Sequence, residues 1–177
     1  MPPTVAERKA ALRQEMRAVR RRLAEGPAER ARRSSTIWAG IAPLLDLGGI
    51  RPTCRDDSRP DRRAMVFTSL PTEPDTGTWP AHLAALGFEV FTPLVEGPDL
   101  RVVPGDVDPA TLDVVLVPGL AFTADGARLG QGGGHFDRFL PRLRPDCLTI
   151  GVGYREQVVD DLPTEAHDVH LTHVVTA

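Results

Sequence analysis

The feature that most constrains the fold is an apolar strand that leads into a glycine-rich loop. Residues 112–118 are almost entirely apolar, and four of the five positions 130–134 are glycine. Glycine has no Cβ atom, so its backbone can approach a bulky anion closely. Arg128 precedes this loop and Asp137 follows it. The order predicts a phosphate held by backbone N–H groups and a cation, with a carboxylate left for Mg²⁺.

Two generic nucleotide fingerprints do not match this loop. The dinucleotide pattern G-x-G-x-x-G requires glycine where His135 stands, and the P-loop pattern requires a lysine that the loop lacks. A tight, solvent-facing connection is the alternative interpretation of such a segment. The combination of glycines with a neighbouring base and acid favours a cradle for nucleotide phosphates.

The elements around the loop predict an α/β fold. We expect helices at 4–24, 28–46, 77–86 and 135–143, and strands at 65–69, 88–94, 112–118, 147–153 and 170–177. Short apolar strands that alternate with helices predict one three-layer domain, a Rossmann-like mainly parallel sheet with helices on both faces. Ligands bind such sheets at the carboxyl ends of the strands, where the glycine loop lies. The polar, turn-rich segment 48–63 is expected to be an exposed linker or insertion.

The first helix has two distinct faces. Thr4 is the expected N-cap, with Glu7 at the capping-box position. A buried stripe is predicted at Leu12, Met16, Val19 and Leu23. A basic ridge with a period of four consists of Lys9, Arg13, Arg17 and Arg21. This ridge is either a solvated face or a surface of which one end reaches an anionic ligand.

Composition excludes several classes of protein. The net charge is −3, although residues 1–63 carry 15 basic and 8 acidic side chains. Aromatic residues make up only 5% of the chain, and no zinc-finger or RNP motif is present, so we expect no binding to nucleic acid. No apolar stretch is long enough for a membrane span or a signal region, so a cytoplasmic protein is expected. Cys54 and Cys147 lack the spacing of a disulfide or zinc framework.

The C-terminal histidines offer a different kind of site. His167, His170 and His173 lie beside Asp168 with the spacing H-x-x-H-x-x-H, which resembles a transition-metal site. A helix would place all three imidazoles on one face. The β-branched surroundings favour a strand instead, in which His170 points away from the other two.

Four motifs, taken in order, resemble the 5-formyltetrahydrofolate cyclo-ligases, also called methenyltetrahydrofolate synthetases. They are a Lys-x-x-x-Arg pair at Lys9 and Arg13, the stretch Glu73-Pro74-Asp75-Thr76, a glycine-containing core from Pro118 to Arg138, and an element from Gly151 through Gln157 and Pro163 to Asp168. The resemblance is thin over 40–63 and 95–111 and otherwise spans the chain.

The resemblance implies an enzyme that cyclises 5-formyltetrahydrofolate to 5,10-methenyltetrahydrofolate with ATP and Mg²⁺, releasing ADP and phosphate. Phosphorylation turns the formyl oxygen into a good leaving group, and the substrate nitrogen N10 then attacks the activated carbon. Such a reaction needs alignment and charge stabilisation rather than a protein nucleophile. The expected partner is a reduced folate, and we expect a monomer.

The resemblance also implies roles for individual residues. Arg128 and Asp137 are the expected catalytic residues. The positions expected at ATP are Lys9, Arg13, Arg128, Gly130, Gly132, Gly133, Gly134, His135 and Phe136. The reduced folate is expected at Glu73 and Thr68. Mg²⁺ is expected at Asp137 and Asp168, because it prefers hard oxygen ligands.

The sequence departs from the family pattern at three places. His135-Phe136 stands where the family has Tyr followed by Tyr or Phe, and segment 48–63 replaces a short turn. Residues 96–111 replace a longer family segment that carries a Gly-Ile-x-Glu-Pro element and helps to build the folate pocket. These departures leave a second interpretation open, namely a nucleotide-binding paralogue that acts on another substrate.

Overall fold

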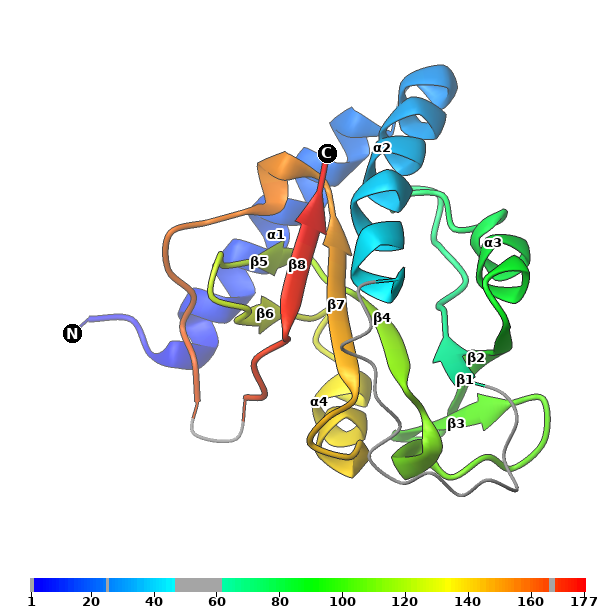
Figure 1. Cartoon of the computed structure of the whole chain (residues 1–177). Helices are drawn as coiled ribbons and strands as arrows, with labels where there is room; N and C mark the ends of the chain where they lie inside the picture. The colour runs from blue at the N-terminus through cyan, green and yellow to red at the C-terminus, as the bar shows by residue number, and fades with distance from the viewer. Residues whose placement is uncertain (1, 25, 47–61, 166–167) are drawn as a thin grey trace.

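The computed structural model describes residues 2–24, 26–46, 62–165 and 168–177 (Figure 1). Its α-helices are α1 (Val5–Leu23), α2 (Pro27–Asp46), α3 (Trp79–Ala85) and α4 (His135–Phe139), and its 3-10 helices are η1 (Pro109–Thr111), η2 (Leu140–Arg142) and η3 (Arg155–Gln157). Its strands are β1 (Arg62–Met65), β2 (Phe88–Glu96), β3 (Asp99–Val103), β4 (Val114–Pro118), β5 (Ala121–Phe122), β6 (Arg128–Leu129), β7 (Leu148–Gly153) and β8 (His173–Thr176). Of the predicted insertion at 48–63, residues 48–61 lie outside the described residues.

The first helix forms as its capping signal predicts. The Thr4 hydroxyl accepts a hydrogen bond from the Glu7 backbone N–H, and the Glu7 carboxylate accepts one from the Thr4 backbone N–H at 2.8 Å. Two orphan donors of the first turn are thereby satisfied. Met16 is buried, as the apolar stripe predicts. Among the described residues, no helix combines the length and the apolar character that a membrane span requires.

The predicted mainly parallel sheet is confirmed. In the part of the chain that the structure describes, six strands form one sheet in the order β3-β2-β1-β4-β7-β8. All neighbours pair in parallel except β2 and β3, which form an antiparallel hairpin. The chain moves from β1 outward to β2 and β3, and then returns to place β4 on the other side of β1. The strand order therefore changes direction between β1 and β4, and crevices at such switch points bind ligands in open α/β sheets.

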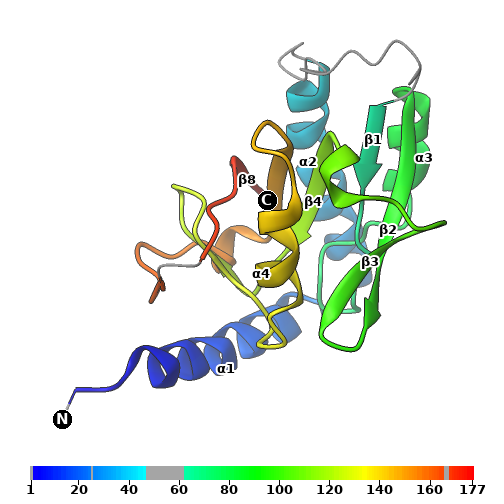
Figure 2. The same cartoon turned by 90° about the horizontal axis from the view of Figure 1, so that it is seen from below.

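Helices cover both faces of the sheet (Figures 1 and 2). Alternate strand residues face opposite sides, so each face has its own apolar core. One core joins α2 and α3 to Ala64, Val114 and Ile150. The other packs Phe139 of α4 against Met65. A third cluster packs α1 on a separate two-stranded hairpin, β5–β6.

Three local predictions differ from the structure. The strand expected at 65–69 is β1, which begins at Arg62 and ends at Met65. Arg62 was assigned to the polar segment because of its charge, yet its guanidinium lies 4.2 Å from the centre of the Phe88 ring, so the charged residue fits the strand. The strand β3 and the hairpin β5–β6 were not predicted, and the strand expected at 170–177 is limited to 173–176.

Candidate active site at the carboxyl ends of β1 and β4

A cavity of about 240 Å³ lies at the switch point of the sheet. Phe67 and Thr68, which follow β1, line it together with Pro118, the last residue of β4. The apolar wall of the cavity consists of Phe67, Leu70, Pro93, Val95 and Leu100. The polar wall consists of Glu73, Arg128, Gly130, Gly133, Gly134 and Asp137. The cavity thus combines an apolar surface with a glycine-rich, charged one.

The glycine loop follows β6 and has a backbone that favours glycine at two positions. Gly132 has φ +107° and Gly134 has φ +67°, both in the left-handed region. A Cβ atom at Gly130 would lie 2.9 Å from Nη1 of Arg128, closer than real Cβ contacts allow. Glycine at 130 therefore leaves room for the guanidinium beneath the loop.

Arg128 supplies the buried positive charge of the polar wall. Its side chain is 5% exposed, its Nη1 donates to the Pro118 carbonyl at 3.1 Å, and it forms an ion pair with Asp137. Burial lowers the pKa of Arg128, while the negative charges of Asp137 and Asp168 oppose that effect. A guanidinium stays protonated at neutral pH even so, because its ordinary pKa exceeds 12. The geometry therefore provides a fixed cation beside the backbone amides of the loop.

Helix α1 supports the glycine loop through its basic ridge. Arg13 Nε donates to the Gly130 carbonyl at 3.1 Å, and Arg17 donates to the Gln131 carbonyl at 2.7 Å. The atoms of Arg13 also lie 3.6 Å from the position of a Cβ at Gly132. Part of the ridge thus contacts the loop that was predicted to hold an anion, rather than facing only solvent.

Lys9, at the start of the ridge, contacts two carboxylates. Its Nζ lies 2.7 Å from Glu165 and 3.0 Å from Asp168. Burial alone would lower the pKa of Lys9, but the hydrogen bonds to Glu165 and Asp168 outweigh it, and the pKa is raised. Asp168 therefore neutralises Lys9 in this structure, and its charge also acts on Arg128.

The two predicted magnesium ligands contact bases rather than one another. Asp137 pairs with Arg128, and Asp168 pairs with Lys9. Within the described ranges, no group of three or more His, Cys, Asp or Glu side chains is arranged to hold a metal ion. A Mg²⁺ ion commonly uses only one or two carboxylates together with phosphate oxygens and water, so these residues fit an ion that arrives with a nucleotide.

The histidine tail does not form a single strand face. His173 begins β8, whereas His170 lies in the preceding segment, with Nδ1 at 3.2 Å from the Asp125 carbonyl oxygen. His167 lies outside the described residues. The expectation that His170 belongs to the strand is therefore wrong, because β8 begins only where pairing with Ile150 of β7 begins.

His135 and Phe136 form one side of the cavity, at the start of α4. Nδ1 of His135 lies 2.9 Å from the Pro98 carbonyl oxygen, in the turn between β2 and β3. The Phe136 ring lies 5.6 Å from the guanidinium carbon of Arg128. The α-helix that follows the glycine loop spans only His135–Phe139 and continues as η2. Since the dipole of so short a helix is small, the positive charge at the loop comes from arginine side chains, the buried Arg128 among them.

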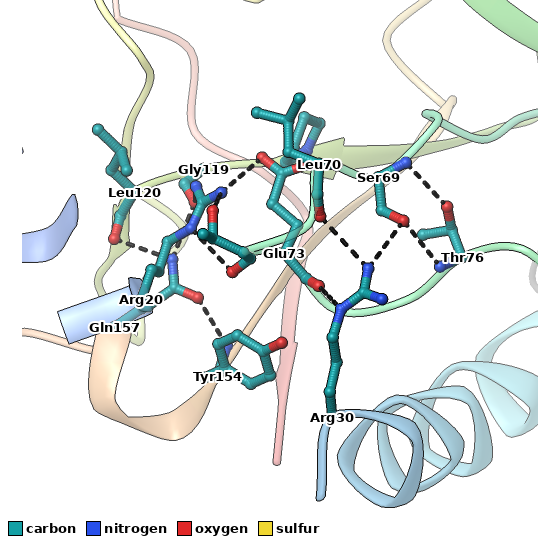
Figure 3. A network of polar contacts seen from close by, with 12 residues as sticks. Arg20, Arg30, Ser69, Leu70, Glu73, Thr76, Gly119, Leu120, Tyr154 and Gln157 are labelled. Atoms are coloured by element: carbon teal, nitrogen blue, oxygen red, sulfur yellow. Dashed lines mark hydrogen bonds and ion pairs between the residues drawn. The ribbon is translucent and has the colours of Figure 1, made fainter. Parts of the chain in front are cut away.

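Glu73 and Thr68 also line the cavity, as predicted for one binding region. Thr68 is exposed at the opening, whereas Glu73 is 5% exposed. Oε1 of Glu73 lies 3.1 Å from Nη2 of Arg20, and Oε2 accepts the Leu70 backbone N–H at 2.8 Å. Figure 3 shows this carboxylate between the Arg20 guanidinium and the backbone of its own loop.

Arg20 is a polar residue of this region that sequence reasoning missed, and Gln157 was recognised only as part of the C-terminal family element, without a role. The Arg20 side chain is 2% exposed, and Gln157 is 1% exposed. The Gln157 amide donates to the carbonyls of Gly119 and Leu120, both at 2.9 Å. A signal was present: Arg20 follows Met16 by four residues and so lies on the apolar stripe of α1, where an arginine requires a buried partner.

Comparisons with known proteins confirm the resemblance to the cyclo-ligases. Residues 96–177 match the model of the 5-formyltetrahydrofolate cyclo-ligase family. A relative of that name from Mycolicibacterium smegmatis is 45% identical over 64 residues, which cover 36% of this chain and 33% of the relative. The Escherichia coli K12 relative is 45% identical over 67 residues, which cover 37% of this chain and 36% of the relative. The matched segment thus spans about a third of these curated relatives.

Solved structures extend the likeness over nearly the whole chain. A 5,10-methenyltetrahydrofolate synthetase from Mycoplasma pneumoniae superposes with a TM-score of 0.75 at 22% identity, covering 94% of this chain and 97% of that one. The Aquifex aeolicus 5,10-methenyltetrahydrofolate synthetase gives a TM-score of 0.68 at 25% identity, covering 95% and 89%. The fold of this chain is the fold of those synthetases.

Proposed function

We propose that this chain, whose residues 96–177 match the model of the 5-formyltetrahydrofolate cyclo-ligase family, cyclises 5-formyltetrahydrofolate to 5,10-methenyltetrahydrofolate, using ATP and releasing ADP and phosphate. The observation that carries the proposal is the two-sided cavity. Its charged, glycine-rich wall suits a triphosphate, and its apolar wall suits an aromatic ring system. Both walls meet at the switch point of the sheet.

The charged wall provides the groups that phosphoryl transfer requires. Arg128 lies buried beside the glycine loop, where it stabilises charge on the transferred phosphoryl group. The backbone of residues 130–134 accommodates the phosphates, and Arg13 approaches the same loop from α1. Asp137 and Asp168 are the carboxylates available to Mg²⁺, which neutralises charge on the phosphates when it is bound.

The apolar wall and Glu73 face the reduced folate in this proposal. The formyl oxygen is a poor leaving group until it receives the γ-phosphoryl group of ATP. N10 then forms a bond to the formyl carbon and loses its proton, while the carbon–oxygen bond breaks and phosphate leaves. Glu73 accepts hydrogen bonds from pterin N–H donors, and Thr68 lies at the cavity opening. The chain's residues thus align the reactants and stabilise charge.

The departures at His135 and at residues 96–111 favour one alternative, a paralogue that binds nucleotide but acts on another substrate. The segment 96–111 nevertheless contributes β3, whose Leu100 lines the apolar wall. An apolar surface for a ring system is therefore retained despite the shorter segment. For this reason the cyclo-ligase reaction remains the first proposal.

The test is an absorbance assay for methenyl product with 5-formyltetrahydrofolate, ATP and Mg²⁺. We expect one ADP for each methenyl group formed, and no product when ATP is omitted. Binding of ATP without any product would reject the cyclo-ligase reaction and support the paralogue.

A further inference from the structure

Arg20 lies behind the cavity, in contact with the loop that carries Glu73 and with the residue that follows β4. It comes from α1, and its side chain is almost completely buried. Besides the Glu73 carboxylate, its guanidinium donates to the Thr72 carbonyl at 3.2 Å and to the Thr72 hydroxyl at 2.8 Å. The Nη1 atom of Arg20 donates to the Gly119 carbonyl at 3.4 Å. One side chain therefore joins the loop that carries Glu73 to the end of β4.

The contact with Gly119 also links Arg20 to the charged wall of the cavity. Gly119 directly follows Pro118, whose carbonyl accepts a hydrogen bond from Arg128. Gln157 donates to the carbonyls of Gly119 and Leu120 from the other side (Figure 3). Because a planar guanidinium fixes several acceptors at once, Arg20 sets the position of Glu73 relative to the strand end beside Arg128.

Among the described residues, the Glu73 carboxylate has two polar contacts, of which the one with Arg20 is with a charged group. Oε1 contacts Arg20, and Oε2 accepts the Leu70 backbone N–H. A charged partner stabilises a carboxylate this deeply buried and fixes its position.

We propose that Arg20 is the positioning residue for Glu73: its guanidinium holds the carboxylate in place, oriented toward the reduced folate. This inference rests on the proposed function, in which Glu73 contacts the reduced folate. Arg20 itself does not line the cavity, so it acts through Glu73 rather than on the substrate.

A double-mutant cycle on Arg20 and Glu73 tests the inference, with KM for 5-formyltetrahydrofolate and KM for ATP as separate readouts. Arg20→Met and Glu73→Gln should each raise KM for the folate by about tenfold or more, with KM for ATP changed less than about twofold. The double variant should resemble Glu73→Gln alone to within about threefold, because the two residues act as one unit. A purely structural ion pair would lower stability without separating the two KM values.

Arg30 is a matched control in the same loop. It comes from α2 and donates to the Glu73 backbone carbonyl at 2.8 Å and to the Leu70 carbonyl at 3.3 Å, without contacting the carboxylate (Figure 3). Any effect of Arg30→Met on KM for the folate should multiply with that of Glu73→Gln. If Arg20→Met does not fold, Arg20→Lys keeps the charge and should show a smaller rise in KM than Glu73→Gln.

Failure of the inference about Arg20 and failure of the proposed role of Glu73 give different results. If the effects of the Arg20 variant and Glu73→Gln multiply, Arg20 does not act through Glu73, and the inference is overturned while the proposed function stands. If Glu73→Gln leaves KM for the folate unchanged, the folate role of Glu73 is wrong, and the inference falls with it.

Discussion

Arg128 is the buried arginine that lines the cavity. It is buried, pairs with Asp137, and is attached to the end of β4 through Pro118. Arg128→Met should lower kcat by about 100-fold or more, because the charge on the transferred phosphoryl group loses its fixed cation. Steady-state kinetics of methenyl formation measures this loss.

Arg144 is a matched control for Arg128. Like Arg128, it pairs with an aspartate. Its partner Asp113 is buried and immediately precedes β4, and so lies at the opposite end of the strand from the cavity. Arg144→Met should lower the melting temperature and leave kcat within about twofold. Equal loss of turnover in both variants would mean that a general loss of structure, rather than a charge in the site, explains the effect.

The burial of Cys147 predicts that the free energy of unfolding depends on pH. Burial raises the pKa of this thiol from 9.0 to about 12. In the unfolded chain the thiol ionises near pH 9, whereas in the folded chain it stays protonated. The unfolded state therefore loses its proton first, and the free energy of unfolding falls as pH rises from about 9 toward 12.

The measurement for Cys147 uses a Cys54→Ser background, which leaves one thiol. A thiol reagent at pH 8 should react with this protein only after unfolding in urea. Between pH 8 and pH 10.5, its stability relative to Cys147→Ala should fall by up to about 1 kcal/mol per pH unit. Rapid reaction of the folded protein at pH 8 would contradict the assigned burial.

At the level of elements, the glycine loop gives the sharpest prediction. Gly132→Ala forces an alanine to adopt φ +107°, a strain of about 1 kcal/mol or more, in the loop assigned to the triphosphate. Gly87→Ala imposes a similar strain at φ +82° in the turn between α3 and β2, where nothing lies within 4 Å of the added Cβ. Both variants should lose comparable stability, but only Gly132→Ala should raise KM for ATP. A similar rise in KM for ATP with Gly87→Ala would contradict the assignment of the glycine loop to the ATP site.

The predictability of each element follows from its length and partners. Helices α1 and α2 each extend over about five turns, so the sequence predicts both, and for α1 it also predicts the cap and the apolar stripe. Strands β5 and β6 have two residues each, too few for any periodicity. Strand β3 alternates buried Leu100 and Val102 with exposed Arg101, a pattern that indicates a strand with one buried face. The prediction missed this strand because residues 96–111 were interpreted only as a shortened family segment.

At the level of the whole molecule, the site could be predicted where it depends on local sequence. Glu73, Arg128 and Asp137 line one cavity, as their motifs suggested. Arg20 escaped prediction because its importance arises from a contact with Glu73, 53 positions along the chain, which only the folded structure brings together. The pairing of Lys9 with Asp168 likewise joins the two ends of the chain and has no local signal.

The central claim is that the glycine loop and Arg128 bind the triphosphate of ATP at the switch point of the sheet. A crystal structure with a non-hydrolysable ATP analogue and Mg²⁺ tests it most directly. We expect phosphate oxygens within hydrogen-bond distance of the backbone N–H groups of residues 130–134 and of the Arg128 guanidinium. A nucleotide bound elsewhere, with this loop closed by its own packing, would contradict it.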